Sequence, residues 1–373
     1  MDDRIRVAFF QPHLDAGGVE RVVLNLLRHL DRKSFRPLLI LGRREGRLLS
    51  MVPDDVTVFD LQGRPMSRAV PRLIECLATS GARVACAGTN ATNIGLLLAA
   101  ALMRRAPAVI VGEHTPPRIY KQQAKWSAFR RLAMRLLYPR AACITVPLAE
   151  IGEELKDLLR VSDLKVRALD NPVLERAALT DCSPRAQLPD FCQGVPILVA
   201  AGRLVHLKGF DILIEAFARL AERWPEGRLV ILGEGPERAR LTALVEDRGL
   251  TSRVFLPGMV DNPMDYFHRA EAVVMTSRYD AAPNVLVEAM AAGAPVVAVD
   301  CPQGPRSILL DGEAGLLVPP EDPGAVADAL GRVLHEPELA ARLRRRGRER
   351  AQDFTVERAL PRYEALFREV AAA

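Results

Sequence analysis

Short apolar runs separated by a helical segment constrain the fold of this chain, most clearly between residues 272 and 299. Residues 272–276 (AVVMT) and 295–299 are rich in branched side chains, which suits strands buried on both faces. Residues 284–292 hold helix formers without a breaker, and Gly293 follows as a stop. This order predicts an α/β fold with a parallel sheet, where ligands bind at the carboxyl ends of the strands.

Composition argues against several classes of protein. The net charge is only +5 and aromatic residues make up 5% of the chain, with no zinc-finger or helix-turn-helix signature, so we expect no nucleic-acid binding. The six cysteines form no C-x-x-C pair, which predicts reduced core thiols rather than a metal site. The N-terminus lacks the shape of a signal peptide, and the most apolar run, residues 94–103, is too short to span a bilayer. We therefore expect a cytoplasmic protein.

Two acids frame the loop after residues 272–276. Asp280 lies in the loop and Glu288 lies in the predicted helix. Pro283 sets the φ angle of the first helical turn, so the helix N-terminus points into the loop and attracts anions such as phosphate. Glu288 can accept hydrogen bonds from a diol such as a ribose. Taken alone, the two acids are better explained as a helix cap, Asp280, and a solvated helix acid, Glu288.

A second polar loop follows the predicted strand 196–201. It carries Gly202, Arg203 and Lys208 in the pattern G-R-x-x-x-x-K-G-x-D. Two cations at a fixed spacing can bind an anionic ligand. The alternative is a pair of surface charges near the start of a helix.

The first half offers fewer signals. Gly17 and Gly18 let the backbone approach a ligand at the start of a predicted helix, although an ordinary tight turn gives the same pattern. No G-x-G-x-x-G follows, which argues against a dinucleotide fingerprint. His114 follows the predicted strand 108–111. It is either a hydrogen-bond donor or base to an acceptor hydroxyl, or a polar residue whose hydrogen bonds are satisfied.

Together these motifs resemble the retaining glycosyltransferases of family 4, which have the two-domain GT-B fold. The matching segments are the two acids with seven residues between them, the arginine–lysine loop, the turn 233–236, residues 257–260 and the glycine pair followed by Glu20 and Arg21. The family usually has Glu-Gly-Phe-Pro where this chain has Asp-Ala-Ala-Pro at 280–283. That departure bears more on the sugar contact than on the ribose contact.

The resemblance implies an α/β fold of two doubly wound Rossmann-like domains facing across a cleft. Residues 1–174 would bind the acceptor and residues 195–353 the nucleotide sugar. Residues 175–194 hold prolines without periodicity and would form the linker. Residues 354–373 would form a helix that crosses back to the first domain. We also expect residues 323–348 to be helical.

The resemblance also implies roles for single residues. The candidates for catalysis are Arg203 and Lys208 on the donor diphosphate, Asp280 by the donor sugar, and His114. The donor-binding candidates are Gly17, Gly18, Gly202, Glu234, Met259, Val260, Pro283, Asn284, Val285, Glu288 and Gly304. Glu288 would hold the ribose. We expect no metal and no cofactor, because no Asp-x-Asp occurs and the two cations can replace a metal.

A basic segment stands out at residues 118–140. It carries seven Lys and Arg residues, and no acid occurs between Glu113 and Glu150. Trp126, Phe129 and Leu132 are among the apolar residues that interleave with the charges at helical spacing, which predicts a basic amphipathic helix. It would either contact an anionic membrane or lipid-pyrophosphate acceptor, or pack on the sheet with its charges merely solvated.

We therefore expect transfer of a hexose or N-acetylhexosamine, with retention, from a UDP-linked sugar to a hydroxyl of a glycan or lipid-linked acceptor. The enzyme would be cytoplasmic, with peripheral contact at the inner face of the membrane. Two alternatives stay open: a nucleotide-sugar 2-epimerase on the same fold, which needs no acceptor, and a non-catalytic nucleotide-sugar-binding relative.

Overall fold

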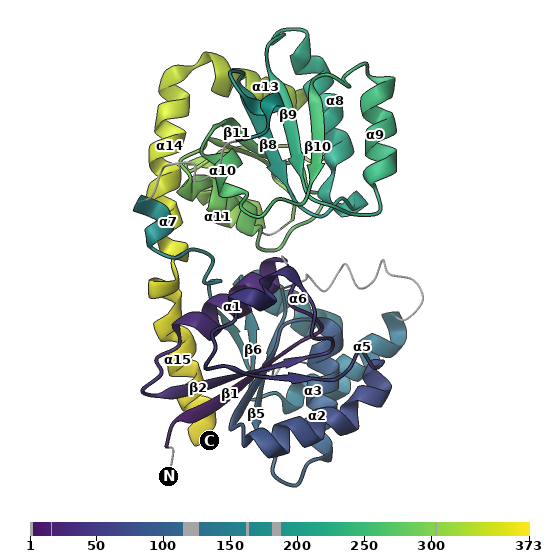
Figure 1. The fold of residues 1–373 in the computed structure, drawn as a ribbon, viewed down its shortest axis with the longest axis vertical. Coiled ribbons are helices and arrows are strands. Elements are labelled where there is room, and N and C mark those ends of the chain that lie inside the picture. Colours follow the sequence, from purple (N-terminus) through teal and green to yellow (C-terminus); the bar gives the residue numbers. More distant parts are fainter. Residues whose placement is uncertain (1–2, 16, 115–126, 162–163, 181–187, 303) are drawn as a thin grey trace. The chain divides into compact units, whose positions relative to one another are not determined.

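The structure is a computed structural model that describes residues 3–15, 17–114, 127–161, 164–180, 188–302 and 304–373. The chain divides into two units, each with its own parallel sheet covered by helices (Figure 1). The first unit comprises Met1–Val173 with Val356–Ala373, and the second comprises Leu174–Thr355. The predicted α/β class with two doubly wound, Rossmann-like sheets is confirmed.

A seven-stranded parallel sheet forms the centre of the first unit. Its strands lie in the order β3 (Thr57–Asp60), β2 (Phe35–Leu41), β1 (Ile5–Gln11), β4 (Val84–Ala87), β5 (Ala108–Gly112), β6 (Cys143–Val146) and β7 (Val166–Ala168). The sheet grows outward in both directions from β1 and β4, so the switch point lies between these two strands.

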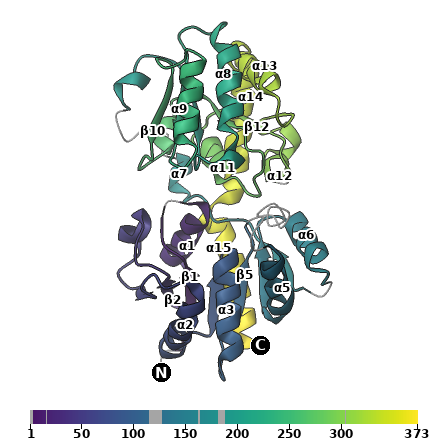
Figure 2. The ribbon, with the colours of Figure 1, turned by 90° about the vertical axis from the view of Figure 1, so that its right-hand side faces the viewer.

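Helices cover this sheet. Helix α1 (Gly18–His29) packs against α15 (Val356–Ala372). The other helices form a row in which each contacts the next: α2 (Met66–Ser80), α3 (Asn90–Leu102), α5 (Ser127–Leu137) and α6 (Ala149–Leu159) (Figure 1, Figure 2). The C-terminal helix α15 thus belongs to the first unit, although the chain reaches it only after completing the second.

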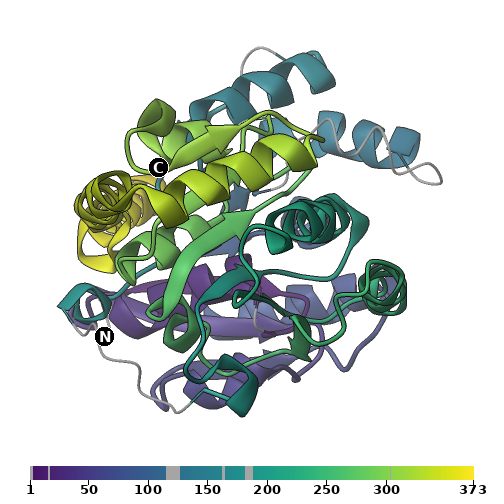
Figure 3. The ribbon, with the colours of Figure 1, turned by 90° about the horizontal axis from the view of Figure 1, so that it is seen from above.

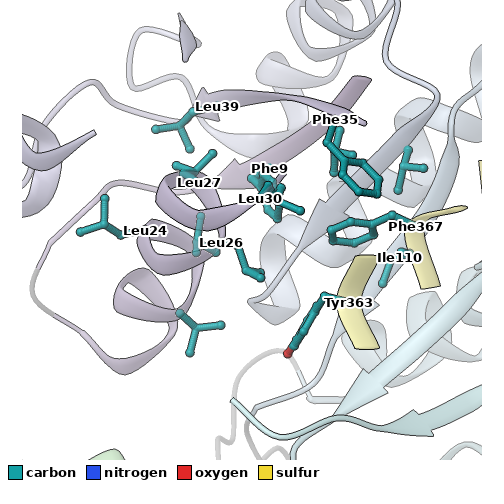
Figure 4. Close-up of a cluster of buried hydrophobic side chains, with 14 of the residues drawn as sticks. Phe9, Leu24, Leu26, Leu27, Leu30, Phe35, Leu39, Ile110, Tyr363 and Phe367 are labelled. Atoms are coloured by element: carbon teal, nitrogen blue, oxygen red, sulfur yellow. The ribbon is translucent and has the colours of Figure 1, made fainter. Parts of the chain in front are cut away.

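Aromatic packing fixes α15 to the first sheet (Figure 4). The Phe367 ring meets the rings of Phe9 and Phe35 edge-on, with centroids 6.1 Å apart in both pairs. Two ion pairs also join α15 to the rest of the first unit: Arg167 binds Glu369, and Arg362 binds Asp170 at 2.9 Å. The core of the first unit is therefore completed by the last residues of the chain.

The second unit holds a six-stranded parallel sheet. Its strands lie in the order β10 (Val254–Gly258), β9 (Arg228–Leu232), β8 (Ile197–Ala201), β11 (Ala270–Met275), β12 (Val296–Val299) and β13 (Leu316–Val318). The switch point lies between β8 and β11. Both strands expected around residues 272–299 are present, with the helix α11 (Asn284–Ala291) between them.

The helices of the second unit flank its strands (Figure 3). They include α8 (Phe210–Ala221), α9 (Arg238–Asp247), α10 (Met264–Phe267), α12 (Gly304–Ile308), α13 (Pro323–His335) and α14 (Pro337–Ala351). Residues 323–348 are helical as expected, but in two helices, because α13 ends before Glu336 and α14 begins at Pro337. Proline has no N–H to donate and disfavours helical geometry in the residue before it.

Part of the segment expected to be a linker belongs to the second unit. The Phe191 ring stacks on Phe255 with centroids 4.2 Å apart, and the Arg228 guanidinium donates to the Phe191 carbonyl. Cys192 is buried beside them. Before this contact the structure describes α7 (Ala177–Thr180), while residues 181–187 lie outside the described chain.

The basic segment is described only from residue 127 onward; residues 118–126, with Trp126, lie outside the described residues. Its described part forms α5, which buries Met134. Phe129, Leu132 and Leu136 are exposed, so the helix does not bury its whole apolar stripe on the unit.

Among the described residues no helix is long and apolar enough to cross a membrane. The five cysteines placed by the structure are free thiols, four of them buried, while Cys182 lies outside the described residues. Burial raises the pKa of the Cys143 and Cys192 thiols to about 11, so these two groups stay protonated at neutral pH.

Packing of α15 predicts where its stability comes from. Phe367→Ala removes a fully buried ring and should lower the free energy of unfolding by about 3–5 kcal/mol. Glu369→Ala on the same helix removes only an exposed ion pair and should have a much smaller effect. Urea unfolding of both variants tests this, and equal losses would contradict it.

Candidate functional site

The loop after β8 is pressed against the end of β11. Gly209 has φ of 63°, and a Cβ at this residue would lie 2.0 Å from the Thr276 carbonyl oxygen, so only glycine fits. The Thr276 hydroxyl donates to the Gly209 carbonyl at 2.8 Å. This contact joins two loops that leave the sheet on either side of its switch point.

Lys208 and Asp280 meet at this point. The Lys208 ammonium lies 2.5 Å from an Asp280 carboxylate oxygen, and both side chains are mostly buried. The structure therefore brings together two predicted catalytic residues that are 72 positions apart in the chain. Arg203, in the same loop as Lys208, is exposed, and within the described parts of the chain no acid pairs with it.

Two residues not predicted from the sequence hold this arrangement. Arg278 binds both carboxylate oxygens of Asp211, at 2.8 and 3.0 Å, and donates to the His206 carbonyl at 2.8 Å. Burial raises the pKa of Asp211, but hydrogen bonds from Arg278 and Arg240 outweigh it and lower the pKa to about 2. Asp211 is therefore charged at neutral pH, and its ion pair with Arg278 forms the Arg278–Asp211 clamp.

The sequence contains a signal for this clamp. Asp211 is the last residue of the pattern that holds Arg203 and Lys208, and Arg278 stands two positions before Asp280. Their partnership could not be read from the pattern, because it depends on β8 and β11 being neighbours.

The helix with Glu288 begins as predicted. Pro283 is the N-cap of α11, and Glu288 lies half-buried within the helix. A Cβ at Gly304 would lie 2.6 Å from both the Ala281 carbonyl oxygen and Pro283 Cδ, so the start of α12 rests on this loop. Asn284 and Val285 form the first turn of α11.

Further donor candidates follow the neighbouring strands. Glu234 comes after β9, and its carboxylate binds Arg238 at 2.6 Å, which lowers its pKa. Met259 and Val260 come after β10. The loops are bonded together, since the Leu204 amide donates to the Glu234 carbonyl at 2.8 Å and the Gly233 amide donates to the Gly258 carbonyl at 2.8 Å. All the donor candidates of the second unit thus lie beyond the carboxyl ends of its strands.

The remaining candidates lie in the first unit. Gly17 is the N-cap of α1, where a Cβ would collide with the Glu20 carboxylate, and Gly18 starts the helix. His114 follows β5 and lines a small cavity of about 40 Å³ together with Gln11. Burial lowers the pKa of His114 to about 4, so the ring is neutral at physiological pH and is a weak base.

Glu113 beside His114 has a structural role. Tyr138 donates to its carboxylate, and Asn93 donates to the same oxygen at 3.0 Å. All three side chains are buried. Among the described residues there is no group of three or more His, Cys, Asp or Glu side chains that could hold a metal, and metal independence stays a prediction.

Comparisons with known proteins fit this geometry. The model of the glycosyl transferases group 1 matches residues 190–350, and that of glycosyltransferase family 4 matches residues 16–174. The chain is 28% identical over 359 residues to a Campylobacter jejuni N-acetylgalactosamine-N,N'-diacetylbacillosaminyl-diphospho-undecaprenol 4-alpha-N-acetylgalactosaminyltransferase, covering 94% of this chain and 95% of the relative.

Two other likenesses are narrower. A Streptomyces coelicolor exopolysaccharide phosphotransferase is 34% identical over 52% of this chain, which spans only 21% of that relative's length. The solved sucrose-phosphate synthase from Thermosynechococcus elongatus has the same fold, with a TM-score of 0.83, 23% identity, and coverage of 99% of this chain and 100% of that one. The two family matches cover most of both units, and the chain belongs to the group 1 glycosyltransferases with the GT-B fold.

Proposed function

We propose that the chain transfers a hexose or N-acetylhexosamine, with retention, from a UDP-linked sugar to a hydroxyl of a glycan or lipid-linked acceptor. The observation that carries this proposal is the meeting of Lys208 and Asp280 at the switch point of the second sheet. Dinucleotide and nucleotide ligands bind at such points in doubly wound folds. The Campylobacter jejuni relative is named for an acceptor linked through diphosphate to undecaprenol, which supports a lipid-linked acceptor.

Binding of the donor would divide between two kinds of group. Arg203 and Lys208 supply positive charge for the diphosphate, and the start of α11 supplies backbone N–H groups. Glu288, inside α11, would accept hydrogen bonds from the ribose hydroxyls. Asp280 would orient the sugar.

The chemistry follows from charge development. As the glycosidic bond to the diphosphate breaks, negative charge grows on the departing phosphate, and fixed cations stabilise that state more than the ground state. The acceptor hydroxyl attacks from the same face, and the departing phosphate takes its proton. His114, neutral in the folded chain, would donate a hydrogen bond rather than remove a proton.

The leaving-group assignment is tested by Arg203→Ala and Lys208→Ala. Each should lower turnover by a factor of about 10²–10³, since one charge contact to the transition state is worth about 2.7–4 kcal/mol. Arg223→Ala is the matched control, because Arg223 is exposed and pairs only with Asp328 at 3.3 Å among the described residues. Steady-state rates with UDP-sugars and an acceptor decide it; near-normal turnover in both variants contradicts the assignment.

The two acids should separate in binding experiments. Glu288→Ala should weaken UDP and UDP-sugar alike, because the ribose is common to both. Asp280→Ala should reduce discrimination between sugars while changing UDP affinity less. Isothermal titration with UDP and several UDP-sugars measures this, with Asp328→Ala as the control. Equal losses for both ligands in both variants would refute the division of roles.

Arg278 should affect turnover indirectly, by holding the loop that carries Lys208. Arg278→Ala breaks the clamp on Asp211 and frees the loop that carries Lys208, so turnover should fall, and Arg278→Lys should restore it only partly because it lacks the two-pronged contact. A double-mutant cycle with Lys208→Ala tests the coupling. If the two losses in transition-state free energy simply add, Arg278 has a separate role.

A further inference from the structure

Gln11 and His114 share the small cavity in the first unit. Gln11 is the last residue of β1 and is only 1% exposed, and His114 lies two residues after the end of β5. Both line the cavity of about 40 Å³, whose walls are otherwise mostly apolar and include Phe9, Ile110 and Phe367 (Figure 4). Two polar side chains thus meet in an apolar setting, where each polar atom needs a hydrogen-bond partner.

Two glycines let these side chains approach each other. Gly88 follows β4, the strand between β1 and β5, and a Cβ at Gly88 would lie 3.4 Å from Gln11 Nε2 and 3.7 Å from His114 Cδ2. A Cβ at Gly112 would lie 3.0 Å from His114 Nε2. Both glycines line the cavity, so the edge of the imidazole that carries Nε2 faces this lining. Nδ1 lies on the opposite side of the ring.

Hydrogen bonding indicates which nitrogen of His114 carries the proton. Nδ1 is buried and forms no hydrogen bond among the described residues. Burial lowers the pKa of His114 to about 4, so at neutral pH the ring carries one proton, on either Nδ1 or Nε2. A proton on Nδ1 would be a buried donor without an acceptor, and orphaned buried N–H groups are rarer than acceptors left unpaired. The proton therefore belongs on Nε2, on the edge that faces the cavity.

Gln11 supplies the acceptor that this N–H needs. Its Oε1 is also buried and forms no hydrogen bond in the part of the chain that the structure describes. The cavity of about 40 Å³ exceeds the roughly 10–15 Å³ that one water requires. One water can accept a hydrogen bond from His114 Nε2–H and donate one to Gln11 Oε1, which satisfies both side chains.

We propose that Gln11 is a positioning residue that holds His114, through one water, as the neutral tautomer with its proton on Nε2. The described lining of the cavity contains no Asp, Glu, Lys or Arg. Burial raises the pKa of Cys86 and of Tyr363, the other titratable groups of this lining, so both are neutral too. In the proposed transfer reaction a substrate hydroxyl would replace the water and receive the same hydrogen bond; this last step alone rests on the proposed function.

The tautomer can be measured directly on the whole protein. Long-range proton–nitrogen correlation spectra of protein labelled with ¹⁵N-histidine distinguish the two neutral forms, and the signal missing from His114→Gln identifies His114. The parent should show the Nε2–H form. Gln11→Met has a similar volume but no acceptor, so the ratio of the Nε2–H to the Nδ1–H form should fall on the order of fivefold, as expected for one lost hydrogen bond.

Two further variants separate positioning from packing. Gln11→Glu keeps an oxygen acceptor at the same length and should keep the proton on Nε2. Val22→Ala removes only apolar atoms from the same cavity and should leave the tautomer ratio unchanged. An Nδ1–H or doubly protonated His114 in the parent, an unchanged ratio in Gln11→Met, or an equal fall in Val22→Ala would overturn the proposal. The spectra need no substrate, so failure of sugar transfer would not affect this test, and the parent spectrum remains decisive if a variant does not fold.

Discussion

The close approach of Gly209 to the Thr276 carbonyl determines the geometry of the second unit's carboxyl edge. It brings the loop after β8 against the loop after β11, at the place where the order of the strands reverses. The Arg278–Asp211 clamp joins the same two segments, because Arg278 follows β11 and Asp211 lies in the first turn of α8. Without this junction, Lys208 and Asp280 would sit on separate loops with no fixed distance between them.

Local patterns were enough to predict much of this unit. The two buried strands and the helix between them follow from branched runs, a proline and a glycine, and they place Glu288 in α11. The Arg278–Asp211 clamp could not be predicted in the same way, because a salt bridge across 67 positions needs the order of the strands. Pro337, which separates α13 from α14, was visible in the sequence, but the helix formers on both sides of it favour a continuous helix.

In the first unit, less could be predicted from local sequence patterns. Its glycine pair and His114 were visible in the sequence, yet their meaning depends on burial, which composition does not give. Burial keeps His114 neutral and occupies Glu113 in hydrogen bonds with Tyr138 and Asn93. The exposed side of α5 was equally hidden, because periodicity shows that a helix has an apolar stripe but not how much of it the fold covers.

The departure at 280–283 from the pattern common in the family is tolerated for a local reason. Ala281 and Ala282 are not among the residues with positive φ, so the backbone here does not need the glycine that the family often has. Ala281 is buried, and its carbonyl lies where a Cβ at Gly304 would be, so the close approach here requires a glycine at 304 and not at 281.

Arginine and lysine then play different parts beside this loop. Arg278 makes a rigid, two-pronged contact that fixes the frame, while Lys208 is a single charge on a flexible stem. A lysine held by one aspartate can exchange that partner for a phosphate without disturbing the loops around it. In the proposed reaction, the clamp therefore keeps the loops rigid while Lys208 changes partners.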